Sequence, residues 1–172
     1  MEIDPKSKIL IDADVLIHFY KGEQMGILKE IYPNQIILLD IVFNEVFIGD
    51  LRIAIENLIR FKTLVEEKLD DCSQEIKKEY FSLSREFGKG ESAIMAYCKF
   101  NKEVLASSNL SDIKTYCDNH KITYLTTMDF LAEAFKNQIL NEKECDQFIK
   151  DVKTKGSKLI RGVDFIRDYR RL

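Results

Sequence analysis

Four short apolar segments, each followed by polar or acidic residues, constrain the fold of this chain more than any other feature. They are residues 8–12, 36–39, 104–106 and 122–125, and each is rich in Ile, Leu or Val. Apolar runs of this length, without strict alternation, are typical of strands buried on both faces of a parallel sheet. We therefore predict a short parallel sheet of four to five strands.

Helical patterns occupy the intervals between these segments. Gly49 is expected to divide one of them into two helices, and Gly88 to end another. Asn141 is a candidate N-cap, with Glu144 at the third helical position. The expected helices are residues 14–20, 23–31, 41–62, 66–87, 91–101, 110–119, 128–137 and 141–154. Short strands that alternate with helices predict an α/β fold of three layers, α/β/α.

The length and composition indicate one globular domain. The chain has 172 residues, 45% of them apolar and only 9 of them Gly or Pro, which is typical of a packed core and excludes collagen-like or disordered chains. We expect a domain over residues 1–155 and a basic C-terminal segment, residues 156–172, packed on it. Without a visible secretory signal or a long apolar run, a cytoplasmic protein with no membrane partner is expected. The four cysteines form no C-x-x-C pair, which favours reduced thiols over a zinc site.

Charge is unevenly distributed along the chain. Lys and Arg number 26 against 29 Asp and Glu, a formal charge of −3, which excludes a generally basic nucleic-acid binder. From Lys150 to Leu172 eight basic residues face three acidic ones, a local charge of +5, so the first 149 residues carry −8. This asymmetry fits an acidic site with a basic rim.

Acidic and polar residues follow the predicted strands and begin the helices after them. Asp12 and Asp14, two residues apart on a segment expected to be extended, should point to the same side. Glu91 is expected at the first residue of a helix. Because sites of parallel sheets form beyond the carboxyl ends of the strands, these residues should gather in one crevice. The full set is Asp12, Asp14, Asp40, Glu45, Glu91, Ser108, Asn109, Asp112 and Asp129.

Carboxylates gathered in this way repel one another and raise one another's pKa. A cation at their centre removes the repulsion, and hard oxygen ligands select Mg²⁺ or Mn²⁺. Such ions promote phosphodiester hydrolysis. Structural interpretations stay open: Asp40 as an N-cap, Asp112 and Asp129 as first-turn acids, and Glu45 in a buried salt bridge. A structural role explains Asp12 less well, because a buried unpaired carboxylate is costly.

Four segments in this order resemble a PIN domain. They are Ile-Leu-Ile-Asp12-Ala-Asp14, Val-Phe-Asn-Glu45-Val, Gly-Lys-Gly-Glu91-Ser and Val-Leu-Ala-Ser-Ser-Asn109. The segment that begins at Leu125, Leu-Thr-Thr-Met-Asp-Phe-Leu, resembles the end of that domain. The likeness covers residues 8–155 and is to the VapC-like toxins and their stand-alone relatives.

The resemblance implies a PIN-like fold and a Mg²⁺- or Mn²⁺-dependent endoribonuclease that leaves 5′-phosphate and 3′-hydroxyl ends. It implies that Asp12, Glu45 and Glu91 are the metal-binding acids and that all three are catalytic, with Glu45 or Asp14 as a candidate to orient and deprotonate the attacking water. Asp14 is given a supporting position, and we add Ser108 and Asp129 to the supporting group. A toxin would also have an antitoxin partner and possible self-association as a homodimer.

The fourth metal position departs from the family pattern. Where the family usually has a Thr-Asp-Asp-like turn, this chain has Ser107-Ser108-Asn109. Asn109 offers a carbonyl oxygen without the charge, and Asp112, one helical turn on, is expected to complete the metal site and its catalytic acids. One metal ion or two therefore remain open. Five basic residues are expected to steer RNA toward the crevice, unless they form a solvated helix face: Lys150, Lys153, Lys155, Lys158 and Arg161.

Two other functions remain open. The first segment also resembles the first motif of haloacid-dehalogenase-type phosphatases, with Asp12 as nucleophile and Asp14 as acid/base. That interpretation has no convincing motif lysine and leaves Glu45 and Glu91 unexplained. The other alternative is a PIN-like binding module, catalytically weakened by Asn109, that retains an RNA partner.

Overall fold

The computed structural model describes residues 3–170 and arranges them around one sheet of five strands. The spatial order is β3-β2-β1-β4-β5, and each neighbouring pair is parallel. The predicted parallel sheet is therefore confirmed. The strands are β1 (Ile9–Ile11), β2 (Ile36–Leu39), β3 (Val65–Glu67), β4 (Val104–Ala106) and β5 (Tyr124–Leu125).

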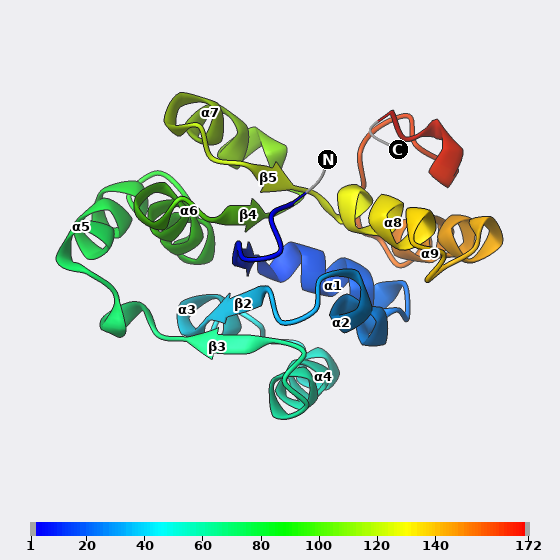
Figure 1. The fold of residues 1–172 in the computed structure, drawn as a ribbon, viewed down its shortest axis with the longest axis horizontal. Helices are drawn as coiled ribbons and strands as arrows, with labels where there is room; N and C mark the ends of the chain where they lie inside the picture. Colours follow the sequence, from blue (N-terminus) through cyan, green and yellow to red (C-terminus); the bar gives the residue numbers. More distant parts are fainter. Residues whose placement is uncertain (1–2, 171–172) are drawn as a thin grey trace.

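Helices cover both faces of the sheet, which confirms the predicted three-layer α/β/α class. Figure 1 shows α5 and α6 on one side of the sheet and α1, α4, α8 and α9 on the other. The α-helices are α1 (Ala13–Lys21), α2 (Leu28–Ile31), α3 (Asp40–Phe43), α4 (Gly49–Arg60), α5 (Gln74–Leu83), α6 (Lys89–Asn101), α7 (Leu110–His120), α8 (Thr127–Lys136) and α9 (Glu142–Thr154). Three 3-10 helices join them: η1 (Met25–Ile27), η2 (Leu69–Asp71) and η3 (Ile166–Asp168).

The central strands form the core because apolar side chains point from both of their faces. Every residue of β1, β2 and β4 is buried. Helix α6 packs across these three strands and is itself buried at Gly90 and from Ser92 to Cys98. The tight packing fixes the position of the first turn of α6, which carries Glu91.

The strand order reverses direction beside β1. From β1 the chain moves outward through β2 to β3, then returns to place β4 on the other side of β1. Ile9 is therefore paired with both Ile36 and Val104. In open parallel sheets such a reversal leaves a crevice at the carboxyl ends of the two diverging strands. Here that crevice lies between the ends of β1 and β4.

The helix predicted over residues 66–87 is wrong at both ends. Residues 65–67 form β3, residues 69–71 form η2, and α5 covers only residues 74–83. The error arises because β3 is an edge strand that pairs with β2 through its backbone while Val65 and Glu66 remain exposed. Its side chains therefore lack the buried pattern that marks the central strands.

The helix predicted over residues 41–62 is also divided differently. Helix α3 ends at Phe43, a turn and an irregular segment follow, and α4 begins at Gly49 rather than breaking there. The Arg52 guanidinium donates to the carbonyl oxygens of Phe43 and Val46, at 3.3 and 3.4 Å, and lies over the Phe43 ring. These contacts of Arg52 hold the segment after α3 in a turn, so Glu45 lies outside a helix. The predicted helix over residues 23–31 is only η1 followed by α2.

The C-terminal segment contacts helices α8 and α9. Val163, Ile166 and Tyr169 are buried, and the Tyr169 hydroxyl donates to Asp129 at 2.7 Å. The Lys153 ammonium donates to the carbonyl oxygen of Val163. Among the helices of residues 3–170, none is long and apolar enough to cross a membrane.

Candidate functional site

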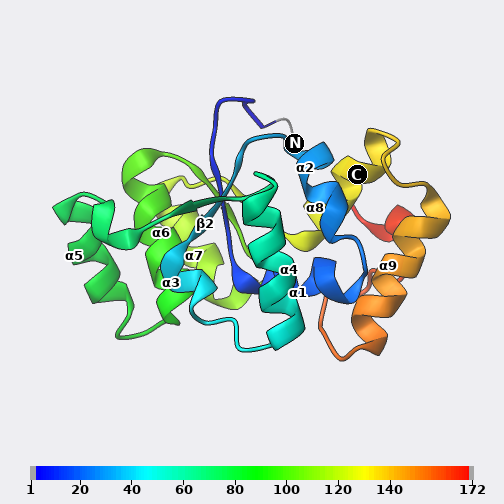
Figure 2. The same ribbon diagram turned by 90° about the horizontal axis from the view of Figure 1, so that it is seen from below.

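The crevice at the ends of β1 and β4 brings together five of the predicted acids. We call them the acidic cluster: Asp12, Asp14, Glu45, Glu91 and Asp112. In Figure 2 the start of α1 and the loop that follows α3 lie along the same lower border of the molecule. Chain segments distant in sequence meet at this border because parallel strands all end on the same side of the sheet.

Asp12 and Asp14 stand at the junction of β1 and α1. Asp12 is 6% exposed and is the N-cap of α1, accepting a hydrogen bond from the Ala13 N–H at 2.8 Å. Asp14 lies in the first turn of α1, not on an extended segment as predicted, so the helix rather than strand alternation places it beside Asp12.

The end of β4 holds the Asp14 carboxylate in place. Its Oδ2 accepts from the Ser108 N–H at 2.7 Å and from the Ser107 hydroxyl at 3.3 Å. Its Oδ1 is buried and makes no hydrogen bond among the described residues. A buried carboxylate oxygen without a hydrogen-bond partner is costly, which helps to explain why the pKa of Asp14 is raised.

Asn109 connects Glu91 to Asp112. Its amide nitrogen donates to Glu91 Oε1 at 2.6 Å and to Asp112 Oδ2 at 2.9 Å. Its carbonyl oxygen accepts from the Ser111 hydroxyl at 2.7 Å. The amide therefore faces the acids with its nitrogen, contrary to the expected ligation by its carbonyl oxygen, and ligation would require the amide to turn over. Glu91 is in the first turn of α6 but is its third residue rather than its first.

Glu45 reaches the cluster from the turn after α3. Its Oε1 accepts from the Gly90 N–H at 3.1 Å, so it contacts the start of the helix that carries Glu91. Gly90 permits this approach because a Cβ there would lie 2.5 Å from Glu45 Oε2. The Gly-Lys-Gly-Glu pattern marks this turn in the sequence, but the close contact with Glu45 is visible only in the structure.

Burial and mutual repulsion raise the pKa values of three of these acids. Burial, with the charges of Asp14 and Glu45, raises the pKa of Asp12 to about 7. Burial and the charge of Glu91 raise the pKa of Asp14 to about 6. Burial, with the charges of Asp12 and Asp112, raises the pKa of Glu91 to about 7. The cluster therefore binds protons near neutral pH in the absence of a compensating cation.

The cluster contains only hard oxygen donors and no basic partner. Within residues 3–170, no Lys, Arg or His forms an ion pair with any of its five members. In the same range, no three His, Cys, Asp or Glu side chains are grouped as ligands around one point. The donor chemistry suits Mg²⁺ or Mn²⁺. The side-chain positions would have to close further around an ion, beginning with the Asn109 amide.

A second layer of hydrogen bonds fixes Ser108 behind the cluster. The Thr127 N–H donates to the Ser108 hydroxyl at 3.0 Å, and the two hydroxyl oxygens are 2.8 Å apart. The Thr127 hydroxyl also contacts His18 Nδ1 at 2.8 Å, and burial lowers the pKa of His18 to about 4. A neutral His18 can either donate to or accept from the Thr127 hydroxyl, according to its tautomer. The sequence offered no signal for this chain of contacts beyond a histidine on an apolar helix.

Asp129 and Asp40 have structural partners. Asp129 forms a capping box with Thr126, its Oδ2 accepting from the N–H and hydroxyl of Thr126, while its Oδ1 accepts from Tyr169. Asp129 therefore supports the end of β5 and the C-terminal segment. Asp40 is the first residue of α3, and its Oδ1 accepts from the N–H groups of Ile41 and Leu69.

The five predicted RNA-contacting residues differ in their partners. Lys153 pairs with Asp164 at 2.6 Å, and Lys155 pairs with Glu23 at 2.7 Å. Lys150, Lys158 and Arg161 are exposed and make no ion pair among the described residues. Arg161 lies in the loop that approaches α7 and α8. Of the five predicted RNA-contacting residues, two are therefore held in ion pairs and three are not, among the described residues.

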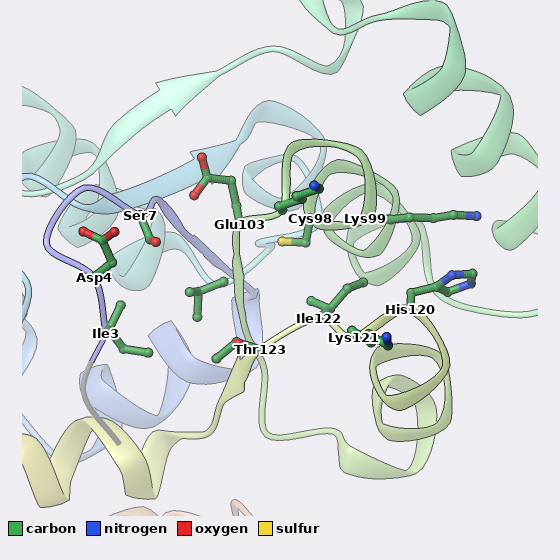
Figure 3. Close-up of a pocket in the computed structure, with 12 residues that line it drawn as sticks. Ile3, Asp4, Ser7, Cys98, Lys99, Glu103, His120, Lys121, Ile122 and Thr123 are labelled. Carbon is green, nitrogen blue, oxygen red and sulfur yellow. The ribbon is translucent and has the colours of Figure 1, made fainter.

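A cavity of about 460 Å³ lies at the opposite edge of the sheet, where the strands begin. Figure 3 shows its lining, which includes Ser7, Lys99, Glu103 and Thr123. The Lys99 ammonium is held by Glu79 at 2.8 Å, and the Glu103 carboxylate accepts from the Lys8 N–H at 2.6 Å. Because these charged groups already have partners, the cavity is a weaker candidate than the acidic cluster.

Comparisons with known proteins add no assignment. No protein-family model, curated protein or solved structure matches the chain. Functional inference therefore rests on the cluster and on the resemblance of its sequence segments.

Proposed function

We propose that this protein is a Mg²⁺- or Mn²⁺-dependent endoribonuclease of PIN-domain type, with the acidic cluster as its active site. One observation carries the proposal: five carboxylates from four separate parts of the chain meet at the strand-order reversal without a basic partner among residues 3–170, and three of them have raised pKa values. Unpaired acids cost stability, and bound divalent cations are a common reason for proteins to keep them.

The proposed ligands are Asp12, Glu91, Asp112 and Asn109. The Asn109 amide nitrogen now donates to both Glu91 and Asp112 and so bridges the two carboxylates. Turning the amide over presents its oxygen to the same space and leaves the two carboxylates for a cation. A bound Mg²⁺ or Mn²⁺ supplies charge that stabilises a phosphodiester transition state and promotes ionisation of water.

Glu45 and Asp14 are the two candidate groups for orienting and deprotonating the attacking water. Glu45 is the better placed of two candidate bases, because Gly90 holds only its Oε1 and the residue is partly exposed. Asp14 is less suited to act as the base, because the Ser107 hydroxyl and the Ser108 N–H both donate hydrogen bonds to its Oδ2. We assign Glu45 as the general base and Asp14 as the residue that holds Ser107 and Ser108 beside the cluster.

A binding module without turnover is the second candidate, and the position of Asn109 favours it. Its amide satisfies Glu91 and Asp112 without a metal, at 2.6 and 2.9 Å. A phosphatase that uses Asp12 as nucleophile is less well supported, because it gives Glu45 and Glu91 no role. Antitoxin binding and self-association belong to the proposal only if the nuclease acts as a toxin.

The first experiment measures Mn²⁺ binding by calorimetry for the wild type and Asp12→Asn. Asn retains the capacity to cap α1 but removes one buried charge, so the fold should persist. We expect binding in the wild type and its loss, at least about tenfold in affinity, in the variant. Asp129→Asn is the matched control, because Asp129 is a buried aspartate bound to Thr126 and Tyr169 outside the cluster.

Cleavage of single-stranded RNA with Mn²⁺ then separates the candidates. Cleavage that disappears in Asp12→Asn supports the nuclease. RNA binding without cleavage, in a protein that binds Mn²⁺, supports the binding module. Equal Mn²⁺ affinity in the wild type and Asp12→Asn would contradict both the metal site and the nuclease.

A further inference from the structure

A second cavity lies beyond the carboxyl ends of β4 and β5, next to the start of α7. It has a volume of about 360 Å³. Leu110, the residue after Asn109, and Thr126, the residue after β5, form one wall. The C-terminal segment forms the other wall, from Ile160 to Val163 and from Asp168 to Arg170. The cavity therefore opens at the same edge of the sheet as the cluster.

Two arginines without ion-pair partners line this cavity. Within residues 3–170, no carboxylate lies within ion-pair distance of Arg161 or Arg170. Three other cations of the region are paired: Lys153 with Asp164, Lys155 with Glu23 and Arg167 with Glu142. Lys150 and Lys158 also make no ion pair among the described residues, but neither of them lines this cavity.

Each of the two arginines lies close in the sequence to a buried residue that holds the backbone in place. Arg170 follows Tyr169, which is buried and bound to Asp129. Arg161 precedes Gly162, which turns the chain with a φ of +77°, and Val163, which is buried. Anchored arginines lose less conformational entropy on binding a planar or tetrahedral anion than arginines on a free tail.

Two other polar side chains of the lining, Thr126 and Asp168, have hydrogen-bond partners within the protein, and Asp168 adds one negative charge to the lining. The N–H and hydroxyl of Thr126 are bound to Asp129. Asp168 is the one acid of the lining, and its Oδ2 accepts from the N–H groups of Asp164 and Phe165, at 3.2 and 2.9 Å. The arginines therefore supply the binding capacity of the cavity.

We propose that Arg161 and Arg170 form a phosphate-binding subsite that holds the backbone of single-stranded RNA beside the acidic cluster. The proposal rests on the nuclease function and adds the direction of the substrate, across the start of α7 toward the C-terminal segment. Arginine binds phosphate oxygens in bidentate fashion, and the positive subsite offsets the repulsion that the cluster exerts on RNA.

The test measures binding of a fluorescein-labelled, 12-nucleotide single-stranded RNA to the full chain by anisotropy, with EDTA present. Arg161→Ala combined with Arg170→Ala should weaken binding at least about tenfold at low salt and reduce the salt slope by about 1.4, the value for two phosphate contacts to a single strand. Replacement of both residues by Lys should restore part of the affinity, since Lys retains the charge but not the bidentate geometry.

The matched control removes two charges elsewhere, with Lys29→Ala and Arg60→Ala. Both residues are exposed and lie on helices α2 and α4, shortly before β2 and β3 begin at the opposite edge of the sheet. This control should change RNA affinity less than about twofold. Equal losses in the two double variants, or no RNA binding by the wild type, would overturn the subsite.

Different experimental results would reject the phosphate-binding subsite and the nuclease function. Mn²⁺ affinity should be unchanged in the double arginine variant, because neither arginine belongs to the cluster. Normal cleavage with unchanged RNA affinity in that variant would reject the subsite and leave the nuclease standing. Arginine-dependent RNA binding without Asp12-dependent cleavage would retain the subsite and reject the nuclease.

Discussion

Two groups of partly or fully buried acids in this protein have pKa values shifted in opposite directions. In the acidic cluster, burial raises the pKa of Asp12 and Glu91 to about 7. Near helices α5 and α6, Glu67 and Glu79 are also partly buried, which alone would raise their pKa values. Hydrogen bonds from Lys8 and Tyr97 to Glu67, and from Lys99 and Tyr116 to Glu79, outweigh burial and lower the pKa of both acids.

The difference lies in the partners rather than in the residue type. Glu79 is 2.8 Å from the Lys99 ammonium and 2.7 Å from the Tyr116 hydroxyl. Glu91 accepts a hydrogen bond from the neutral Asn109 amide at 2.6 Å, and it faces the charges of Asp12 and Asp112. Glu79 therefore has partners within the protein that favour its charged form, whereas the acids of the cluster lack a basic partner among the described residues, which is the basis of the proposed metal site.

Glutamine substitution at one acid of each region should separate function from stability. Glu91→Gln is expected to reduce Mn²⁺-dependent RNA cleavage at least about 100-fold, because it removes a proposed ligand. Glu79→Gln is expected to leave cleavage unchanged and to cost about 1–2 kcal/mol of unfolding free energy, because it weakens charge-assisted hydrogen bonds. Cleavage rates and urea unfolding at pH 7.5 check both. A cleavage loss in Glu79→Gln equal to that in Glu91→Gln would contradict the division.

The two regions should also respond oppositely to pH in metal-free protein. The folded-state pKa of Asp12 is about 7 against an ordinary value of 3.8, so the folded state binds more protons than the unfolded state between these values. The contribution of Asp12 to stability therefore falls as pH rises from about 4 to 7. The lowered pKa of Glu79 has the reverse sign, since its stabilisation is present above its ordinary value of 4.5 and disappears as pH falls through its folded value.

Asp12→Asn isolates the cluster's share of this pH dependence. At pH 8 with EDTA the variant should be more stable than the wild type by an amount on the order of a few kcal/mol, and at pH 4 the difference should vanish. Urea unfolding at the two pH values measures it, and saturating Mn²⁺ should remove the advantage at pH 8. A variant less stable than the wild type at pH 8 would show that repulsion does not dominate at Asp12.

Alanine substitutions at Gly90 and Gly88 test whether the close contact between Gly90 and Glu45 matters for cleavage. In Gly90→Ala the new Cβ would lie 2.5 Å from Glu45 Oε2 and 3.3 Å from Val42, so Glu45 must move. We expect cleavage to fall about 10- to 100-fold because the general base is displaced. Gly88→Ala is the control, since its Cβ would meet only Glu91 Oε2 at an ordinary 3.5 Å. Equal cleavage by the two variants would argue against a role for Glu45.

Asn109→Asp tests the departure from the family pattern and carries the smallest expected effect. The added carboxylate should tighten Mn²⁺ binding about 3- to 10-fold, because a charged ligand replaces a neutral one. It should also lower the melting temperature of the metal-free protein at pH 8 through added repulsion. Calorimetry and thermal unfolding measure the two changes. Weaker Mn²⁺ binding in Asn109→Asp would exclude residue 109 as a ligand.

The sequence predicted the central strands and most of the longer helices. Ile9–Ile11 and Ile36–Leu39 were predictable because strands buried on both faces require continuous apolar runs. The Asn141 cap was predictable because a capping box depends on residues only three apart, and its two hydrogen bonds are present. The edge strand Val65–Glu67 was missed because backbone pairing with β2 leaves its side chains largely exposed.

For the candidate site, residue types and their positions after strands indicated the acids. The sequence did not indicate that Asp129 is bound to Thr126 and Tyr169, or that the Asn109 amide turns its nitrogen toward Glu91. It also gave no sign of Arg170 beside Arg161. Each of these depends on contacts between segments distant in the chain.

The layered α/β class follows from the sequence, because local apolar runs and helical periodicity decide which segments bury which faces. Long-range packing returns β4 to a place beside β1 and brings Asp12 and Glu91 within electrostatic range. The pKa of a carboxylate depends on its burial and on charges a few ångströms away. Those distances are set by strand order and helix packing, which local sequence patterns do not specify.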